Sequence, residues 1–281
     1  MAPQLGTAGW GAPALVLDAA ATSIAGPRSD NQDAACAGPH LLAVADGVGG
    51  NVGGATAAAL VIGQLAARRR GADDEADAGL GSAVAAASGA LRAAIARTPR
   101  LAAMATTLTV AALTPDGRLA VAHVGDSRAY LLRDGQLLQL THDQTLVQAL
   151  VDAGTITAEL ARTHALRALV LAALHGTAED AKQVVMTSHD LVAGDRLLVC
   201  SDGLTGFVEP DMISRILIEE HRPAEAVARL LRASLAAGTK DNVTAAVADV
   251  AVVGSVHPAW PTVVGAAATS RRSGATTMPV G

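Results

Sequence analysis

Short apolar runs separated by tight turns are the feature that most limits what this chain can fold into. The runs occupy residues 41–45, 106–113, 119–124, 129–132, 196–200 and 243–250. Each has the length and composition of a buried strand. Turn-forming residues join neighbouring runs at Thr114-Pro115-Asp116-Gly117 and at Arg133-Asp134-Gly135. Because such short connections link antiparallel strands, the pattern predicts antiparallel pairing rather than a doubly wound parallel sheet.

Helical patterns lie between and after these runs. Two of them, Gly54 to Arg70 and Ala78 to Arg97, are separated by a charged segment and predict a helical pair. A later helix is predicted to begin near Pro223 and to stop at Gly238, since proline suits a first turn and glycine a C-terminal cap. Another is expected after Pro210. Helix pairs together with antiparallel strands predict a layered α+β fold in which helices cover sheets that pack on each other.

The composition decides what fills the core and where the domain ends. Apolar residues make up 51% of the chain but aromatic residues only 1%, so the core must consist of Ala, Leu and Val. Segments 1–14 and 254–281 are rich in Gly, Pro, Ser, Thr and Ala without a sustained period, which predicts flexible tails. Residues 15–253 are therefore expected to form one domain.

Charge and cysteine content exclude several classes of protein. A net charge of -5 and the scarcity of aromatic side chains argue against nucleic acid binding. Cys36 and Cys200 form neither a disulfide framework nor a zinc motif, which favours a reducing, cytoplasmic setting. No N-terminal signal pattern is present, and the apolar segment 251–269 is interrupted by Pro258 and Pro261, so we expect no membrane span.

Four aspartates stand where an apolar run meets a polar turn. They are Asp33, Asp46, Asp202 and Asp241. Taken singly, each aspartate is more simply interpreted as a turn residue, and two of them precede glycine. Taken together, strand-end carboxylates make a rigid, all-oxygen site that selects Mg²⁺ or Mn²⁺ over zinc. Two such ions can activate water and orient a phosphoryl group, so the set predicts phosphate ester hydrolysis.

Arg28 is the candidate phosphate ligand. It lies five residues before Asp33 in a stretch whose only other charge is Asp30. A guanidinium group binds phosphate oxygens in a bidentate manner that lysine cannot match. We therefore expect Arg28 and Asp33 to line one pocket.

Six ordered segments carry a family resemblance. They are Arg28 to Asp33, Leu42 to Gly50, Met104 to Leu108, Val124 to Tyr130, Asp195 to Leu204, and Lys240 to Thr244. Together they resemble the motifs of the PP2C (PPM) family of metal-dependent serine/threonine phosphatases in its bacterial form, over residues 20 to 250. The resemblance implies a four-layer α/β/β/α sandwich, with two antiparallel β-sheets flanked by antiparallel helix pairs.

The resemblance also implies a ligand set for two Mn²⁺ or Mg²⁺ ions. Asp46 would bridge the ions, Gly47 would add its backbone carbonyl, and Asp33, Asp202 and Asp241 would complete the site. Catalytic roles would fall to Arg28, Asp33 and Asp46.

Three further residues receive roles by the same motifs. Asp126 would bind a third, weaker ion together with Asp202, although a turn role remains open. Asn242 and Gln32 would hold the metal ligands in place without touching the ions themselves.

The reaction implied is hydrolysis of phosphoserine and phosphothreonine by a metal-bridging hydroxide that attacks phosphorus in line. The implied partners are proteins phosphorylated by bacterial Ser/Thr kinases, and the implied state is a monomer. Two alternatives remain open: a catalytically weak regulatory or phosphoprotein-binding module with this fold, and a hydrolase of small phosphate esters.

Several positions depart from the family pattern. Gln32 replaces the usual Glu, which predicts weaker metal retention, and Val48 replaces the histidine of animal members. A flap is expected at about 141–180, with a helix at 147–154. Its departures are Gln144 for the usual His, and Ala165, Ala168, Leu171, Ala172 and His175 for Pro, Asn, Thr, Arg and Gly. We therefore expect the flap to have its own conformation and specificity.

Overall fold

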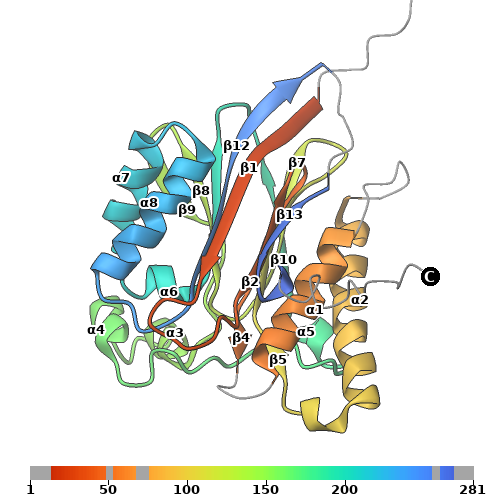
Figure 1. Ribbon diagram of the computed structural model, residues 1–281. Helices are drawn as coiled ribbons and strands as arrows, with labels where there is room; N and C mark the ends of the chain where they lie inside the picture. Colours follow the sequence, from red (N-terminus) through yellow and green to blue (C-terminus); the bar gives the residue numbers. More distant parts are fainter. Residues whose placement is uncertain (1–13, 49–52, 68–75, 255–259, 269–281) are drawn as a thin grey trace, which may run out of the picture.

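Two antiparallel β-sheets packed face to face form the centre of the protein (Figure 1). The computed structural model describes residues 14–48, 53–67, 76–254 and 260–268. The five-stranded sheet has the order β1 (Ala14–Ile24), β12 (Val243–Val253), β11 (Arg196–Cys200), β8 (Arg128–Arg133) and β9 (Gln136–Gln139). The six-stranded sheet has the order β10 (Val185–Asp190), β7 (Arg118–Val124), β6 (Leu108–Leu113), β3 (Leu41–Ala45), β2 (Ala34–Gly38) and β13 (Thr262–Gly265). A short pair, β4 (Gly47–Val48) and β5 (Ala105–Thr106), lies apart.

Helices cover the outer face of each sheet. The pair α1 (Gly54–Ala67) and α2 (Ala76–Arg97) packs on the six-stranded sheet, and the pair α7 (Pro210–Glu219) and α8 (Pro223–Ala236) packs on the five-stranded sheet (Figure 1). Three apolar cores result: one between the sheets and one under each helix pair. The predicted α/β/β/α sandwich is confirmed.

Strand β3 shows why continuous apolar runs form this sandwich. Leu42 and Val44 face the core between the sheets, whereas Ala43 and Ala45 face α1. Because both faces are buried, the strand needs no polar alternation. The helix-facing side chains are small, which lets α1 lie close to the sheet despite the scarcity of aromatic residues.

The predicted turns and caps are present. Asp134 and Gly135 between β8 and β9 both have positive φ, 50° and 75°, as a two-residue hairpin turn requires. Helix α8 starts at Pro223, and Gly238 follows its C-cap with a φ of 79°. These local signals were sufficient to place both features.

Helix α2 is the one described helix that is long and apolar enough to cross a membrane, over Gly79–Arg97. One face of it is buried, however, with Leu80, Val84 and Leu91 in the core that α2 shares with α1 and the six-stranded sheet. This burial is typical of the core helix of a globular domain.

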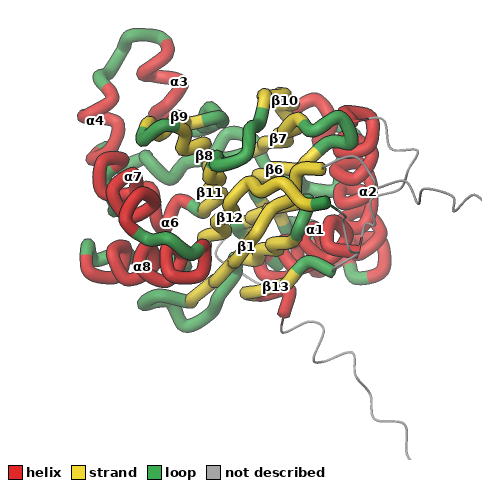
Figure 2. Tube along the Cα trace, turned by 90° about the horizontal axis from the view of Figure 1, so that it is seen from above, coloured by secondary structure: helices red, strands yellow, loops and turns green. Residues whose placement is uncertain are grey.

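The flap lies between β9 and β10. It contains α3 (Leu146–Asp152) and α4 (Ala158–Thr163), which lie side by side and project from the rest of the molecule in Figure 2, and it ends near the short helix α5 (Asp180–Gln183). The buried carboxylate of Asp180 accepts hydrogen bonds from Ser88 Oγ on α2 (2.6 Å) and from the Gly176 N–H (2.8 Å). The end of the flap is thereby fixed to α2.

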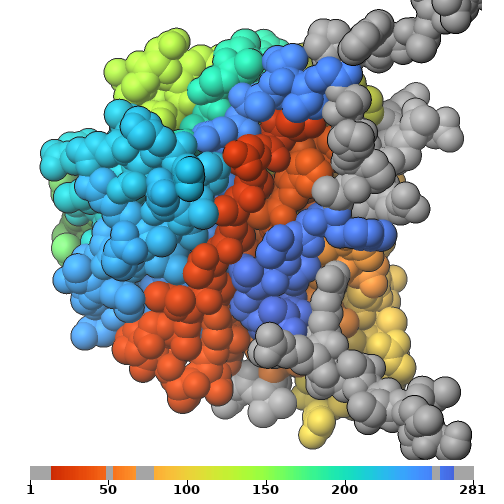
Figure 3. Space-filling model, turned by 45° about the horizontal axis from the view of Figure 1, so that its top comes forward, coloured from red at the N-terminus to blue at the C-terminus, as the bar shows by residue number. Residues whose placement is uncertain are grey.

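The chain termini differ in part from expectation. A flexible tail was predicted from residue 254, but Thr262–Gly265 pairs with β2 as strand β13, so the prediction is wrong for these residues. Figure 3 shows this segment in blue beside β1 in red. Segments 1–13, 255–259 and 269–281 of the expected tails, and Gly49 and Gly50 of the second motif, lie outside the described residues.

Candidate active site

The antiparallel topology brings the predicted aspartates to one end of the sandwich. Asp33 precedes β2 and Asp46 follows β3, and these strands pair with Ala34 opposite Ala45. In the other sheet Asp202 follows β11 and Asp241 precedes β12, paired with Cys200 opposite Ala245. Since each pair of strands ends at the same edge, all four side chains converge.

A cavity of about 270 Å³ opens at this edge. Its lining includes Arg28, Gln32, Asp46, Gly47, Asp126, Asp202, Asp241 and Asn242. Asp33 lies behind this lining, with only 1% of its surface exposed. The structure thus brings every predicted site residue to one place.

Asp33 is held by a set of hydroxyl groups that the sequence did not reveal. Its Oδ2 accepts hydrogen bonds from Ser201 Oγ (2.8 Å) and Thr244 Oγ1 (2.7 Å). Its Oδ1 is buried and has no hydrogen-bond partner among the residues that the structure describes. A buried carboxylate oxygen without a donor is costly, and a cation is the partner that would satisfy it.

Burial and mutual repulsion raise the pKa values of the clustered carboxyl groups. Burial raises the pKa of Asp33 to about 6, against the two hydroxyl donors. Burial, with the charge of Asp241, also raises the pKa of Asp202 to about 6, whereas Asp46 and Arg167 oppose the rise. The pKa of Asp46 lies well above its usual range because of burial and then the charges of Asp33 and Asp202. Such groups repel one another unless positive charge lies between them.

The residues present fit a site for hard divalent cations. The donors are carboxylate oxygens, with the Gly47 carbonyl at the cavity wall. Among the residues that the structure describes, no group of three His, Cys, Asp or Glu side chains is arranged to hold an ion by itself. Water would therefore have to complete the coordination of each ion, as is usual for Mg²⁺.

The segment after β3 is fixed by two threonines, Thr106 at the end of β5 and Thr107 between β5 and β6. Thr107 Oγ1 accepts a hydrogen bond from the Asp46 N–H (3.0 Å), and Thr106 Oγ1 donates to the Asp46 carbonyl (2.9 Å). A Cβ on Gly47 would collide with the backbone of Gly54 at the start of α1. Glycine at this position therefore permits the close approach that holds Asp46 in the cavity.

Arg28 is oriented by the loop that carries Asp241. Its Nε donates to the Lys240 carbonyl (2.7 Å) and its Nη2 donates to Asp241 Oδ2 (2.8 Å). Neither bond uses Nη1, and the side chain is 54% exposed at the cavity. Arg28 can therefore bind an incoming anion without giving up its supports.

Asn242 joins two loops of the site. Its Oδ1 accepts from the Gln32 N–H (2.8 Å), and its Nδ2 donates to the carbonyls of Ala25 and Asp30. Only its backbone N–H bonds Asp241, at Oδ1 (2.8 Å). Its side chain therefore supports the loop of Arg28 and Gln32, whereas Asp241, which it was expected to support, is bonded by its backbone alone.

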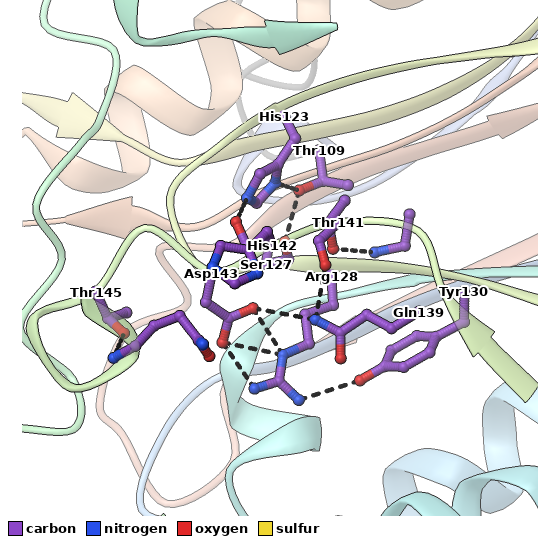
Figure 4. A network of polar contacts seen from close by, with 12 residues as sticks. Thr109, His123, Ser127, Arg128, Tyr130, Gln139, Thr141, His142, Asp143 and Thr145 are labelled. Carbon is purple, nitrogen blue, oxygen red and sulfur yellow. Dashed lines mark hydrogen bonds and ion pairs between the residues drawn. The ribbon is translucent and has the colours of Figure 1, made fainter. Parts of the chain in front are cut away.

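The base of the flap is tied to the site through a polar network, shown in Figure 4. Arg128 makes a bidentate ion pair with Asp143, with Nη2–Oδ2 at 2.7 Å. The buried His123 contacts Thr109 Oγ1 (2.9 Å) and the His142 carbonyl (3.0 Å). These contacts connect the strands on either side of Asp126 to the first residues of the flap.

Gln144 performs a structural task in place of the histidine that the family pattern predicts. Its Oε1 accepts from the Gly125 N–H (2.8 Å), and its Nε2 donates to the Gln183 carbonyl (2.9 Å). Ala168 and Val170, farther along the flap, line the cavity. The divergent flap is thus anchored at the site, with small apolar residues over the cavity.

The two cysteines have no catalytic placement. Both are buried. Burial raises the pKa of the Cys200 thiol to about 12, so it stays protonated at neutral pH. A thiol-based phosphatase mechanism is therefore excluded for these residues.

Gln32 provides a test of metal retention. The Gln32→Glu variant is expected to bind Mn²⁺ about fivefold to tenfold more tightly, because it adds one negative charge at the cavity wall. Gln32 lines the cavity beside Asp46. Titration calorimetry would measure the affinity, with Gln136→Glu on the exposed start of β9 as the matched control. Equal affinity of wild type and Gln32→Glu would contradict this expectation.

Residues 26–248 match the family model described as protein phosphatase 2C. The serine/threonine protein phosphatase PstP of Mycobacterium tuberculosis is 44% identical over 242 residues, which cover 84% of this chain and 45% of that protein. The serine/threonine phosphatase stp of Listeria monocytogenes is 37% identical over 143 residues, 50% of this chain and 55% of that protein. The chain thus spans about half the length of the curated relatives it matches.

Solved structures agree in fold. A crystal structure of the M. tuberculosis phosphatase PstP/Ppp matches with a TM-score of 0.78 and 43% identity, covering 83% of this chain and 98% of that one. A structure of the catalytic domain of PstP in complex with two manganese ions matches with a TM-score of 0.76 and 42% identity, covering 84% and 99%. The family match over residues 26–248 includes Arg28 and all of the converging carboxylates, and this chain belongs to the protein phosphatase 2C family.

Proposed function

We propose that this chain hydrolyses phosphoserine and phosphothreonine in proteins, using Mn²⁺ or Mg²⁺. The observation that carries the proposal is the convergence of Asp33, Asp46, Asp202 and Asp241 on one cavity, with a buried, unpartnered Oδ1 on Asp33. The manganese-bound structure of the PstP catalytic domain supports the choice of ion. The names of the relatives support the choice of substrate.

The residues would divide the work by position. Asp33, Asp46, Asp202, Asp241 and the Gly47 carbonyl would hold two ions, and Asp126 with Asp202 a third. Two such ions lower the pKa of water and neutralise phosphoryl oxygens in an in-line displacement. Arg28 would bind and orient the substrate phosphate through its unused Nη1.

The proposal also includes the cellular compartment, the source of the substrates and the oligomeric state. The buried thiol of Cys200, which forms no disulfide, fits a reducing cytoplasm. We propose phosphoproteins made by bacterial Ser/Thr kinases as substrates and a monomer as the working form, as the family resemblance implies.

Hydrolysis assays with and without Mn²⁺ test the proposal. We expect turnover of both p-nitrophenyl phosphate and a phosphothreonine peptide in Mn²⁺, and loss of turnover in excess chelator that returns when Mn²⁺ is restored. Turnover that survives the chelator would refute the metal mechanism. Peptide binding without turnover would favour the regulatory module, and turnover restricted to the small ester would favour a small-ester hydrolase.

A further inference from the structure

A second cavity lies between the flap and α6 (Asp202–Thr205). Its volume is about 210 Å³. Its lining includes Asp126, Arg128, Asp143, Arg162, Arg167 and Asp202. Asp126 and Asp202 line the catalytic cavity as well, so the two cavities meet at these carboxylates. We call the second one the flap cavity.

The three arginines of the flap cavity differ in how their charge is used. Arg128 is neutralised by its bidentate pair with Asp143, and only 22% of its side chain is exposed. Arg162 on α4 pairs with Glu209, with Nη2–Oε1 at 2.6 Å. Arg167 has no carboxylate within ion-pair distance among the described residues, and it is exposed. Of the three arginines, Arg167 is therefore the one whose positive charge is available to a ligand.

Arg167 is also held in place on one face. Its guanidinium group lies over the ring of Phe207, 5.9 Å from the centroid, and Phe207 follows the end of α6. Stacking on a ring leaves the edge of a guanidinium group, with its N–H donors, open to an anion. Asp126 and Asp202, which line both cavities, would be neutralised by cations in the working enzyme. The charge of Arg167 would then make the flap cavity electrostatically positive.

We infer that the flap cavity is a second anion subsite, in which Arg167 binds an acidic side chain of the substrate, a carboxylate or a second phosphate, close in sequence to the phosphorylated residue. The inference rests on the proposed phosphatase function, since the shared wall places this subsite next to the scissile phosphate. A flexible peptide with its phosphate beside Arg28 could reach the flap cavity only with residues near the phosphorylated one. Arg167 then determines specificity rather than the chemical step.

Peptide sets with defined flanks test the subsite. Phosphothreonine peptides would carry, at each flanking position in turn, alanine, glutamate, lysine or a nonhydrolysable phosphonate. In wild type, at least one position is expected to favour the acidic flank over alanine by about tenfold in kcat/KM, the range of a charge-assisted hydrogen bond. The glutamate and phosphonate arms show which anion is preferred.

Three variants separate a subsite from a structural role. The acidic-to-alanine ratio is expected to fall to about one in Arg167→Ala and to invert toward lysine flanks in Arg167→Glu, whatever the change in absolute rate. Arg232→Ala, on the exposed face of α8 and outside both linings, should keep the wild-type ratio.

Other outcomes would overturn the subsite. The first is a wild-type kcat/KM that does not depend on the charge of the flanking residues. The second is an Arg167→Ala variant with a lower kcat/KM for all peptides and an unchanged acidic-to-alanine ratio. Absence of turnover with every peptide would instead count against the phosphatase function. In that case, fluorescence anisotropy of labelled phosphonate-threonine peptides would still show whether an acidic flank strengthens binding and whether Arg167→Glu reverses it.

Discussion

Replacing Asp46 with alanine is expected to lower Mn²⁺-dependent hydrolysis by about a thousandfold or more, because it removes a central ligand of the charge-stabilising site. Asp46 is the carboxylate whose pKa responds to all four of the others, Asp33, Asp202, Asp126 and Asp241. Initial rates with p-nitrophenyl phosphate and with a phosphothreonine peptide, at saturating Mn²⁺, would measure the loss.

The matched control is Asp211→Asn, which removes one carboxylate charge from the exposed first turn of α7. It should keep wild-type rates. Metal content of both variants, determined by elemental analysis, would show whether activity and bound Mn²⁺ are lost together. Full activity of Asp46→Ala would refute the assignment of this site.

The second large effect concerns stability in the absence of metal. Asp46→Asn should raise the melting temperature of metal-free protein by several degrees at pH 7.5, even though it destroys activity. The variant removes a charge from a buried, repulsive cluster, and its amide can donate to Asp202. With Mn²⁺ the order should reverse, because binding to the native state stabilises the wild type.

The sign of the pH dependence follows from the raised pKa values. A carboxyl group whose pKa is higher in the folded than in the unfolded state binds more protons when folded, so its stabilising contribution is lost as pH rises. For Asp33, a rise from 3.8 to about 6 corresponds to about 3 kcal/mol lost across that window. The advantage of metal-free Asp46→Asn should therefore shrink toward zero near pH 4. Differential scanning calorimetry from pH 4 to 7.5 in chelator would measure it, and an advantage that grew at low pH would contradict the repulsion argument.

Regular and local features of the fold could be predicted from the sequence. Strands buried on both faces, such as β3 and β11, are continuous apolar runs, and α8 has proline and glycine at its ends. Strands β1 and β10 are among those that were missed, as are the short strands β2 and β9. Most of β1 is only partly buried and β10 is largely exposed. Both strands therefore include polar residues, which interrupt the continuous apolar run that marks a buried strand in the sequence. Their place is fixed by pairing with β12 and β7, which no local pattern shows.

The candidate site likewise contains residues that the sequence predicted and residues that only the structure revealed. The aspartates and Arg28 were found because each lies in a short ordered motif. The hydroxyl donors Ser201 and Thr244 were not, because they reach Asp33 from positions far along the chain, and Ser and Thr are common in turns. Arg167 lies in the divergent flap, where no motif marks it, and it became significant only once the flap cavity placed it near Asp202.

Strand β13 sets a practical limit on where the catalytic unit can be cut. The Ala266 N–H donates to the Asp33 carbonyl (2.8 Å), and Gly265, with a φ of 70°, packs so closely there that a side chain would collide with that same carbonyl. A fragment trimmed at Val253, where the apolar pattern ends, would leave the outer edge of β2 open to pairing with another chain. It would also remove the hydrogen bond that holds the Asp33 carbonyl. If such a fragment failed to bind metal, the cause would be the missing edge strand and not a defective ligand.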